Sequence, residues 1–173
     1  MSNVLIGIIG VILFIGLALA GALLLGDDFK AANNDTKAAA VVQAMSQTAN
    51  AVSMYTIKTG MAKQSEAVTS SSGLIPRFLK AAPMNPVTKA QGITLGDQWG
   101  NVSTSTALSV HMLLGTSAEA KNVCEAIQRQ SGQIAPTADF DNTGRSLSAW
   151  ALPATSGCLR NGSNSGYYAF TKL

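Results

Sequence analysis

Charged side chains are scarce in this chain. Asp, Glu, Lys and Arg make up 12% of its 173 residues, compared with about 25% in an average soluble domain. The net charge is only +3, so nothing demands a nucleic-acid surface, and direct binding of nucleic acid is not expected. A surface covered by Ser, Thr, Asn and Gly suits an extracellular polymer better than a crowded cytosolic enzyme.

Histidine is nearly absent as well. His111 is the only one, which excludes a conventional zinc site built on several histidines. A Ser–His–Asp site would need all its partners around this residue, so we expect His111 to be a surface or half-buried strand residue. There is no CxxC pair and no phosphate-binding glycine loop. We therefore expect no catalytic residue, no metal and no cofactor, and the chain is predicted not to be an enzyme.

Only two cysteines occur, Cys124 and Cys158. Such a pair fits one disulfide formed outside the cytosol. On the chain-entropy model, closing a loop of this length stabilises the fold by about 3–4 kcal/mol. The alternative is two unrelated buried thiols.

What the chain does have is a long apolar run at its beginning. The segment Val4 to Leu25 contains no charge, no Ser, Thr, Asn or Gln, and no Pro. As a helix it would be roughly 33 Å long, enough to cross the hydrocarbon layer of a bilayer. Either lipid or other copies of the same helix must cover it. We predict that residues 1–26 form one apolar N-terminal helix, which is a membrane span or the core of a filament.

The residues before this run do not form an ordinary secretory signal. Only Met1, Ser2 and Asn3 precede it, and Lys30 is the first basic residue. A signal peptide needs a positive start and a cleavage site, and a plain anchor usually carries Lys or Arg on its cytoplasmic side. We expect that a short basic leader was removed and that Met1 is the processed N-terminus.

Small residues occur at intervals along the apolar run. Such residues let helix backbones approach closely in an apolar medium. Gly16 and Ala20 stand four apart, on one face. One interpretation is packing between copies in a filament core; the other is the ordinary glycine content of a membrane span. The candidates for filament-core packing are Gly7, Gly10, Gly16, Ala20 and Gly21.

The helix is predicted to continue beyond the apolar run, over residues 27–60. From Phe29 to Ile57 there is no Pro and no Gly. Gly26 is expected to weaken the helix locally, so we call it a soft spot. Apolar residues recur every three or four positions and form one stripe that should lie against a globular domain: Ala38, Val41, Met45, Ala49 and Val52. Thr59-Gly60 is the predicted end.

Residues 61–173 are predicted to form a globular head. Leu74 to Leu79 is expected to make a short helical turn over the core. A helix should run from a capping box at Thr116–Glu119, capped by the Thr116 hydroxyl, to Gln130, and end at Gly132. In the half-buried segment Thr106–Leu114, Leu108, Val110, Met112 and Leu114 should face inward, and Ser109 and His111 outward. The other strand candidates are Ile93–Val102, Ser146–Leu152 and Tyr167–Thr171.

Two further features have simple interpretations. Asp139–Gly144 is similar to the start of a calcium loop, but the twelfth position is Trp150 rather than a carboxylate, so an exposed turn is favoured. The aromatic residues are expected in the core or sheet, with subunit contact or host adhesion as the alternative: Trp99, Trp150, Tyr167, Tyr168 and Phe170.

The predicted fold class is α+β, a long N-terminal helix packed on an antiparallel sheet.

These parts together resemble a type IV pilin. The stretch Asp35–Ala39, the run Asn85-Pro86-Val87-Thr88, the helix start at Thr116–Cys124 and a mature Met1 resemble the type IVb branch, to which toxin-coregulated and conjugative-plasmid thin pili belong. The resemblance implies a long curved helix with its second half on an antiparallel sheet. It also implies leader removal by a prepilin peptidase, N-methylation, and an exposed C-terminal variable region bounded by Cys124 and Cys158.

The resemblance also implies a function. The chain would wait in the bacterial inner membrane and then polymerise through its N-terminal helix into an extracellular pilus. Its partners would be copies of itself, the bilayer, the inner-membrane assembly machinery and the prepilin peptidase. The alternatives are a minor or tip pilin, or a secretion-system pseudopilin, that primes a filament, and a bitopic membrane-anchored receptor or enzyme.

One position departs from the family pattern. Most pilins carry Glu at mature position 5, thought to neutralise a neighbour's N-terminal amine, and this chain has Leu5. An unpaired ammonium group in an apolar core is costly. Either Ser2 and Asn3 solvate the amine, or it sits near carbonyls freed at a glycine; alternatively, the missing Glu marks a minor pilin. The type IVa branch usually has Pro near position 22, where this chain has Ala22.

Overall fold

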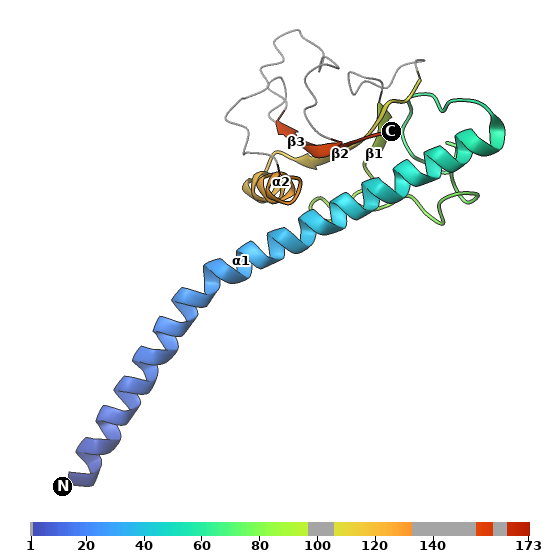
Figure 1. Ribbon diagram of the computed structural model, residues 1–173. Coiled ribbons are helices and arrows are strands. Elements are labelled where there is room, and N and C mark those ends of the chain that lie inside the picture. The colour runs from blue at the N-terminus through green and yellow to red at the C-terminus, as the bar shows by residue number, and fades with distance from the viewer. Residues whose placement is uncertain (1, 97–105, 133–154, 161–165) are drawn as a thin grey trace. The chain divides into compact units, whose positions relative to one another are not determined.

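The computed structural model describes residues 2–96, 106–132, 155–160 and 166–173, without the side chains of residues 2–6, 22–25 and 27. The described residues form an α+β structure, which confirms the predicted class. The chain divides into two compact units, Met1–Asn34 and Asp35–Leu173. The predicted strand Ser146–Leu152, the loop Asp139–Gly144, Trp99 and Trp150 lie outside the described residues. The described elements are α1 (Ser2–Thr59), β1 (Ile93–Gly96), β2 (Ser109–Gly115), α2 (Ala118–Gln130), β3 (Ser156–Arg160) and β4 (Tyr167–Lys172) (Figure 1).

The first unit is the beginning of α1. The helix has no break at Gly26, where a soft spot is expected from the sequence. A single glycine inside a helix costs only about 1 kcal/mol. Good helix formers on both sides, such as Leu25 and Ala31, are enough to keep the backbone helical there.

In the second unit, α1 contributes the predicted apolar stripe. Ala38, Val41 and Met45 are completely buried, and Val52 is 5% exposed. Thr48 is also fully buried on this stripe, where its hydroxyl donates to the Ala44 carbonyl one turn earlier, at 2.9 Å. The predicted end is confirmed, because α1 stops at Thr59 and Gly60 has φ +69°, the left-handed conformation that glycine adopts without strain.

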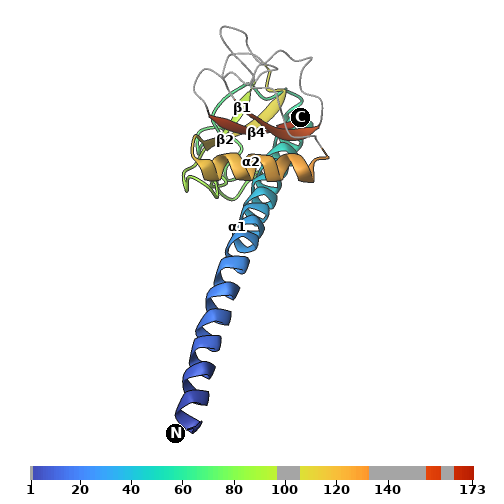
Figure 2. The same cartoon turned by 90° about the vertical axis from the view of Figure 1, so that its left-hand side faces the viewer.

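The described residues form a sheet of four antiparallel strands in the order β1-β2-β4-β3. Val110, Met112 and Leu114 of β2 are fully buried and belong to the same core as the α1 stripe. The second part of α1 and α2 lie on the same side of the sheet (Figures 1 and 2). Tyr167, Tyr168 and Phe170 lie on β4, as expected for sheet aromatics. β1 lies in the first part of the predicted strand Ile93–Val102, and the rest of that prediction falls outside the described residues.

The prediction that β2 is half-buried is wrong. Ser109 and His111, expected to face outward, are only 2% and 5% exposed. The register pairs His111 with Phe170 on β4, and Phe170 is completely buried, so this face of the sheet is covered at His111. Leu113, on the same face of β2, is 42% exposed. Leu108, expected to face inward, is 47% exposed and lies just before the first residue of β2, Ser109.

The second helix forms close to where it is expected, but with a different cap. The predicted capping box places the cap at Thr116, whereas the observed N-cap is Ser117, whose hydroxyl accepts from the Ala120 amide at 3.1 Å. Ser117 is the last residue with extended backbone angles, so its oxygen is the one that reaches the free amides of the first turn. The helix ends at Gln130, and Gly132 follows with φ +71°, as expected.

The predicted disulfide is present. Cys124 of α2 is bonded to Cys158 of β3, with their Cα atoms 5.4 Å apart. Both cysteines are buried. Next to them, the Gln128 side chain donates to the Cys158 carbonyl at 2.8 Å. The bond therefore ties α2 to an edge strand of the sheet, although β3 itself is not among the predicted strands.

The segment between α1 and β1 contributes buried residues to the second unit. The expected turn at Leu74–Leu79 is confirmed, since the Phe78 amide donates to the Leu74 carbonyl at 2.8 Å, and Leu74 is fully buried. Asn85 is 1% exposed. Its side-chain oxygen accepts from the Val87 amide at 2.8 Å, and its Nδ2 donates to the Leu113 carbonyl at 2.6 Å. Asn85 thus anchors the segment to β2.

Candidate functional site

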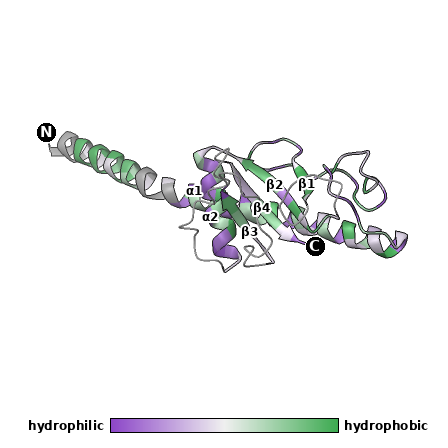
Figure 3. Ribbon diagram, turned by 90° about the horizontal axis from the view of Figure 1, so that it is seen from above, coloured by the Kyte–Doolittle hydropathy of each residue, from purple (hydrophilic) through white to green (hydrophobic). Residues whose placement is uncertain are grey.

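The first unit carries a large exposed apolar surface. Nine large apolar side chains in its described part each expose between 50% and 74% of their surface, and this part of the helix is mostly hydrophobic in Figure 3. Contiguous apolar surface of this kind marks a site that another molecule or a membrane covers. The residues are Ile8, Ile9, Val11, Ile12, Leu13, Phe14, Ile15, Leu17 and Leu19.

The predicted small residues lie within this surface. A Cβ atom built on Gly7, Gly10, Gly16 or Gly21 would meet no atom within 4 Å, and Ala20 is exposed. Packing inside the single chain therefore does not require glycine at these positions. The space beside them is available to a neighbouring helix, so they remain candidates for contact between copies. Met1 lies outside the described residues.

Within the part of the chain whose side chains are described, no helix combines the length and the apolar character needed to cross a membrane. The predicted segment Val4–Leu25 reaches beyond that part at both of its ends.

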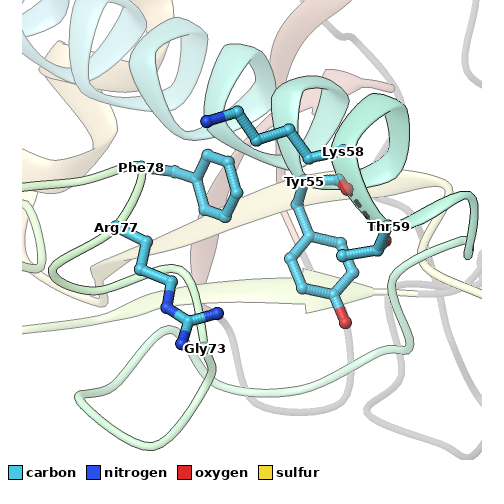
Figure 4. A pocket seen from close by; sticks show the side chains of 6 residues that line it. All are labelled: Tyr55, Lys58, Thr59, Gly73, Arg77 and Phe78. Carbon is cyan, nitrogen blue, oxygen red and sulfur yellow. Dashed lines mark hydrogen bonds between the residues drawn. The ribbon is translucent and has the colours of Figure 1, made fainter.

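The second unit contains a pocket at the end of α1. It has a volume of about 430 Å³ and lies between the last two turns of α1 and the segment around Arg77. Figure 4 shows Lys58 and Arg77 flanking the Phe78 ring, with Tyr55 beside it. The rings of Tyr55 and Phe78 meet edge to face, with their centroids 6.0 Å apart. The lining residues are Tyr55, Lys58, Thr59, Gly73, Arg77 and Phe78.

The charges around this pocket are predominantly positive. The Lys58 ammonium group lies 5.8 Å from the centroid of the Phe78 ring, and Lys63 lies 4.9 Å from that of Tyr55. Lys63 also pairs with Glu66, at 2.6 Å. Among the residues that the structure describes, Lys58 and Arg77 form no ion pair with a carboxylate. The pocket therefore presents two uncompensated cations next to two aromatic rings.

The His111 side chain does not lie at the surface. It is buried on β2, and its Nε2 lies 2.5 Å from the Ser109 hydroxyl, which is also buried. In the described ranges, no three His, Cys, Asp or Glu side chains are grouped so that they could hold a metal ion. That the chain is not an enzyme remains a prediction.

The pocket is the feature that reasoning from the sequence did not identify. Its residues come from two segments about twenty positions apart, so no short motif contains them. The sequence pointed to the pocket only weakly, through Tyr55 and Lys58, which lie three residues apart near a helix end and so share a face. Only the turn at Leu74–Leu79 brings Arg77 and Phe78 to that face.

Comparison with protein-family models, with curated proteins and with solved structures finds no match for this chain.

Proposed function

We propose that this protein is a structural subunit of an extracellular filament of the type IVb pilus kind, with a pilin fold, polymerising through its N-terminal helix. The observation that carries this proposal is the exposure of the apolar side chains from Ile8 to Leu19, each at least half accessible in the single chain. A surface of this size needs an apolar partner. Copies of the same helix supply that partner in a filament, and lipid supplies it before assembly.

The physical basis of assembly follows from the composition of this helix. Lipid and neighbouring helices remove the same apolar side chains from water, so the hydrophobic effect contributes little to the difference between the two states. Close contact at Gly16 and Ala20, together with contacts between heads, must then favour the filament. A transfer that is nearly balanced in free energy suits a filament that the inner-membrane machinery extends and retracts.

A minor or tip pilin, or a pseudopilin, is the second candidate, and Leu5 is the observation that favours it. Without a carboxylate at position 5, each copy placed inside a filament core buries an N-terminal amine without the usual partner. A subunit used once per filament bears this cost once. Abundance separates the two candidates, because a major subunit is the dominant protein of purified filaments.

The proposal is tested by electron microscopy of material sheared from the surface of cells that express the full chain. Immunogold labelling with an antibody against the head should decorate filaments along their length, and mass spectrometry should find this chain as their main protein. Labels only at filament ends would favour the minor subunit. A chain that stays in the membrane as a monomer, with no filaments, would overturn both and favour a membrane-anchored receptor or enzyme.

A further inference from the structure

The pocket at the end of α1 brings together two described cations, Lys58 and Arg77, that have no carboxylate partner among the described residues. The described Asp and Glu side chains of the second unit all have basic partners in the same unit. These pairs are Asp35–Arg129, Lys63–Glu66, Lys37–Glu119 and Lys121–Glu125. Lys58 and Arg77, both exposed, are therefore free to receive an anionic group from outside the chain.

The walls of the pocket narrow the choice of ligand. Phe78 and Tyr55 are both partly buried and pack against the core, so they form a fixed aromatic wall beside the two cations. Met54, Ile57 and Met61, which are close to the lining residues Tyr55, Lys58 and Thr59 in the chain, are 52%, 81% and 62% exposed. A ligand that fits combines an anionic group, such as a carboxylate, which Arg binds well through its planar group, with an adjacent apolar group.

The first unit presents this combination of groups. Asp28 is exposed and forms no ion pair with any residue that the structure describes. Phe29, the next residue, is 73% exposed. Both lie within four residues of the end of the apolar run at Leu25, which the proposed function places between copies, so a contact made by Asp28 and Phe29 continues that interface.

We infer that the pocket of one copy receives Asp28 and Phe29 of a second copy, with the carboxylate on Arg77 and Lys58 and the ring against Phe78 and Tyr55. This inference rests on the proposed function and adds a specific contact to it. Complementary charges of this kind select the partner and fix its register more than they add affinity. The contact would therefore help to set the offset between neighbouring subunits.

Charge reversal tests the pairing in the full chain. Asp28→Arg alone, and the pair Lys58→Glu with Arg77→Glu, should each reduce the yield of sheared filaments by about tenfold or more, because like charges then meet in the contact. Combining all three substitutions in one chain should restore the yield. The matched control is Lys80→Glu, which reverses an exposed cation outside the pocket and should leave the yield unchanged. Thermal unfolding of each variant in detergent shows that the head remains folded.

Cysteine cross-linking tests whether the contact joins two copies. The native cysteines are bonded to each other, as Cys124–Cys158, so Asp28→Cys combined with Arg77→Cys adds two new thiols. Oxidation of filaments from this variant should give a ladder of covalent oligomers, whereas each single substitution should give at most dimers. Normal filament yield from Asp28→Arg, or oxidised filaments that run as monomers, would overturn the inference and leave the proposed function intact. Absence of filaments from the unmodified chain would instead overturn the proposed function.

Discussion

Arg129 at the end of α2 pairs with Asp35 of α1, and the two side chains approach to 3.0 Å between Nη2 and Oδ1. The neighbouring Gln130 side chain donates to the Asp35 backbone carbonyl at 3.1 Å. Lys37 and Glu119 form a second pair between the same helices. Polar contacts thus connect α2 to the stretch of α1 at which the second compact unit begins.

The Asp35–Arg129 pair is expected to contribute little to stability. Its side chains are 52% and 62% exposed, and an exposed pair of this kind is worth about 1 kcal/mol at most. Arg129→Gln should lower the free energy of unfolding in urea by less than about 1 kcal/mol. In about 1 M NaCl, where the screening length is near 3 Å, the difference should disappear. A larger loss that persists in salt would show that Arg129 acts through packing instead of charge.

The Met45 side chain should contribute far more to the free energy of unfolding than the Asp35–Arg129 pair does. It is completely buried in the core on the α1 stripe, and truncation leaves a cavity, so Met45→Ala should cost about 2–5 kcal/mol of unfolding free energy. The matched control is Met54→Ala on the same helix, because Met54 is 52% exposed and should change stability by no more than about 0.5 kcal/mol. Urea unfolding monitored by tryptophan fluorescence measures both losses. Equal losses of unfolding free energy in Met45→Ala and Met54→Ala would contradict the placement of the stripe.

Reduction of the disulfide should weaken the head. Cys124 and Cys158 are 34 residues apart in the chain, and the chain-entropy model predicts a loss of about 4 kcal/mol when the bond is removed. The urea midpoint of the unmodified chain should therefore fall in dithiothreitol. A variant with Cys124→Ala and Cys158→Ala should show the lowered midpoint with or without reductant. A midpoint that does not respond to reductant in the unmodified chain would show that the bond contributes no stability.

Asn85 should be the most sensitive polar residue between α1 and β1. Asn85→Ala removes the donor to the Leu113 carbonyl and the acceptor for the Val87 amide. It should therefore cost about 2 kcal/mol or more, because buried polar groups lose their partners. Asn122→Ala on the exposed side of α2 is the control and should be nearly neutral. Similar unfolding midpoints for the two variants would contradict the anchoring role.

The small residues of the first unit can be tested through assembly. Gly16→Leu meets no atom of its own chain, and leucine is a better helix former than glycine by about 1 kcal/mol. The single chain should therefore tolerate it, and filament formation should be lost only because a neighbouring helix can no longer approach. Gly16→Ala should retain more filaments than Gly16→Leu in sheared material. Normal filaments from Gly16→Leu would show that close packing at this position is unimportant.

Local patterns made α1 and the disulfide predictable. The stripe from Ala38 to Val52 follows the helical repeat, and Gly60 ends the helix through a property of its own backbone. With only two cysteines in the chain, one pairing is available. In contrast, β3 has five residues, including Gly157, and no clear alternation of polar and apolar residues, so nothing in its sequence distinguishes it from a loop. Its place in the sheet depends on pairing with β4.

The sequence by itself determined the apolar run, the amphipathic continuation of the helix and the single cysteine pair, because each follows from neighbouring residues or from simple counting. Only the tertiary structure decided that Ser109 and His111 of β2 are buried, that Asn85 is buried against Leu113, and that Arg77 and Phe78 join Tyr55 and Lys58 around one pocket. The physical reason is that burial and charge compensation depend on segments far apart in the chain, and local periodicity carries no information about which distant segment will cover a given face.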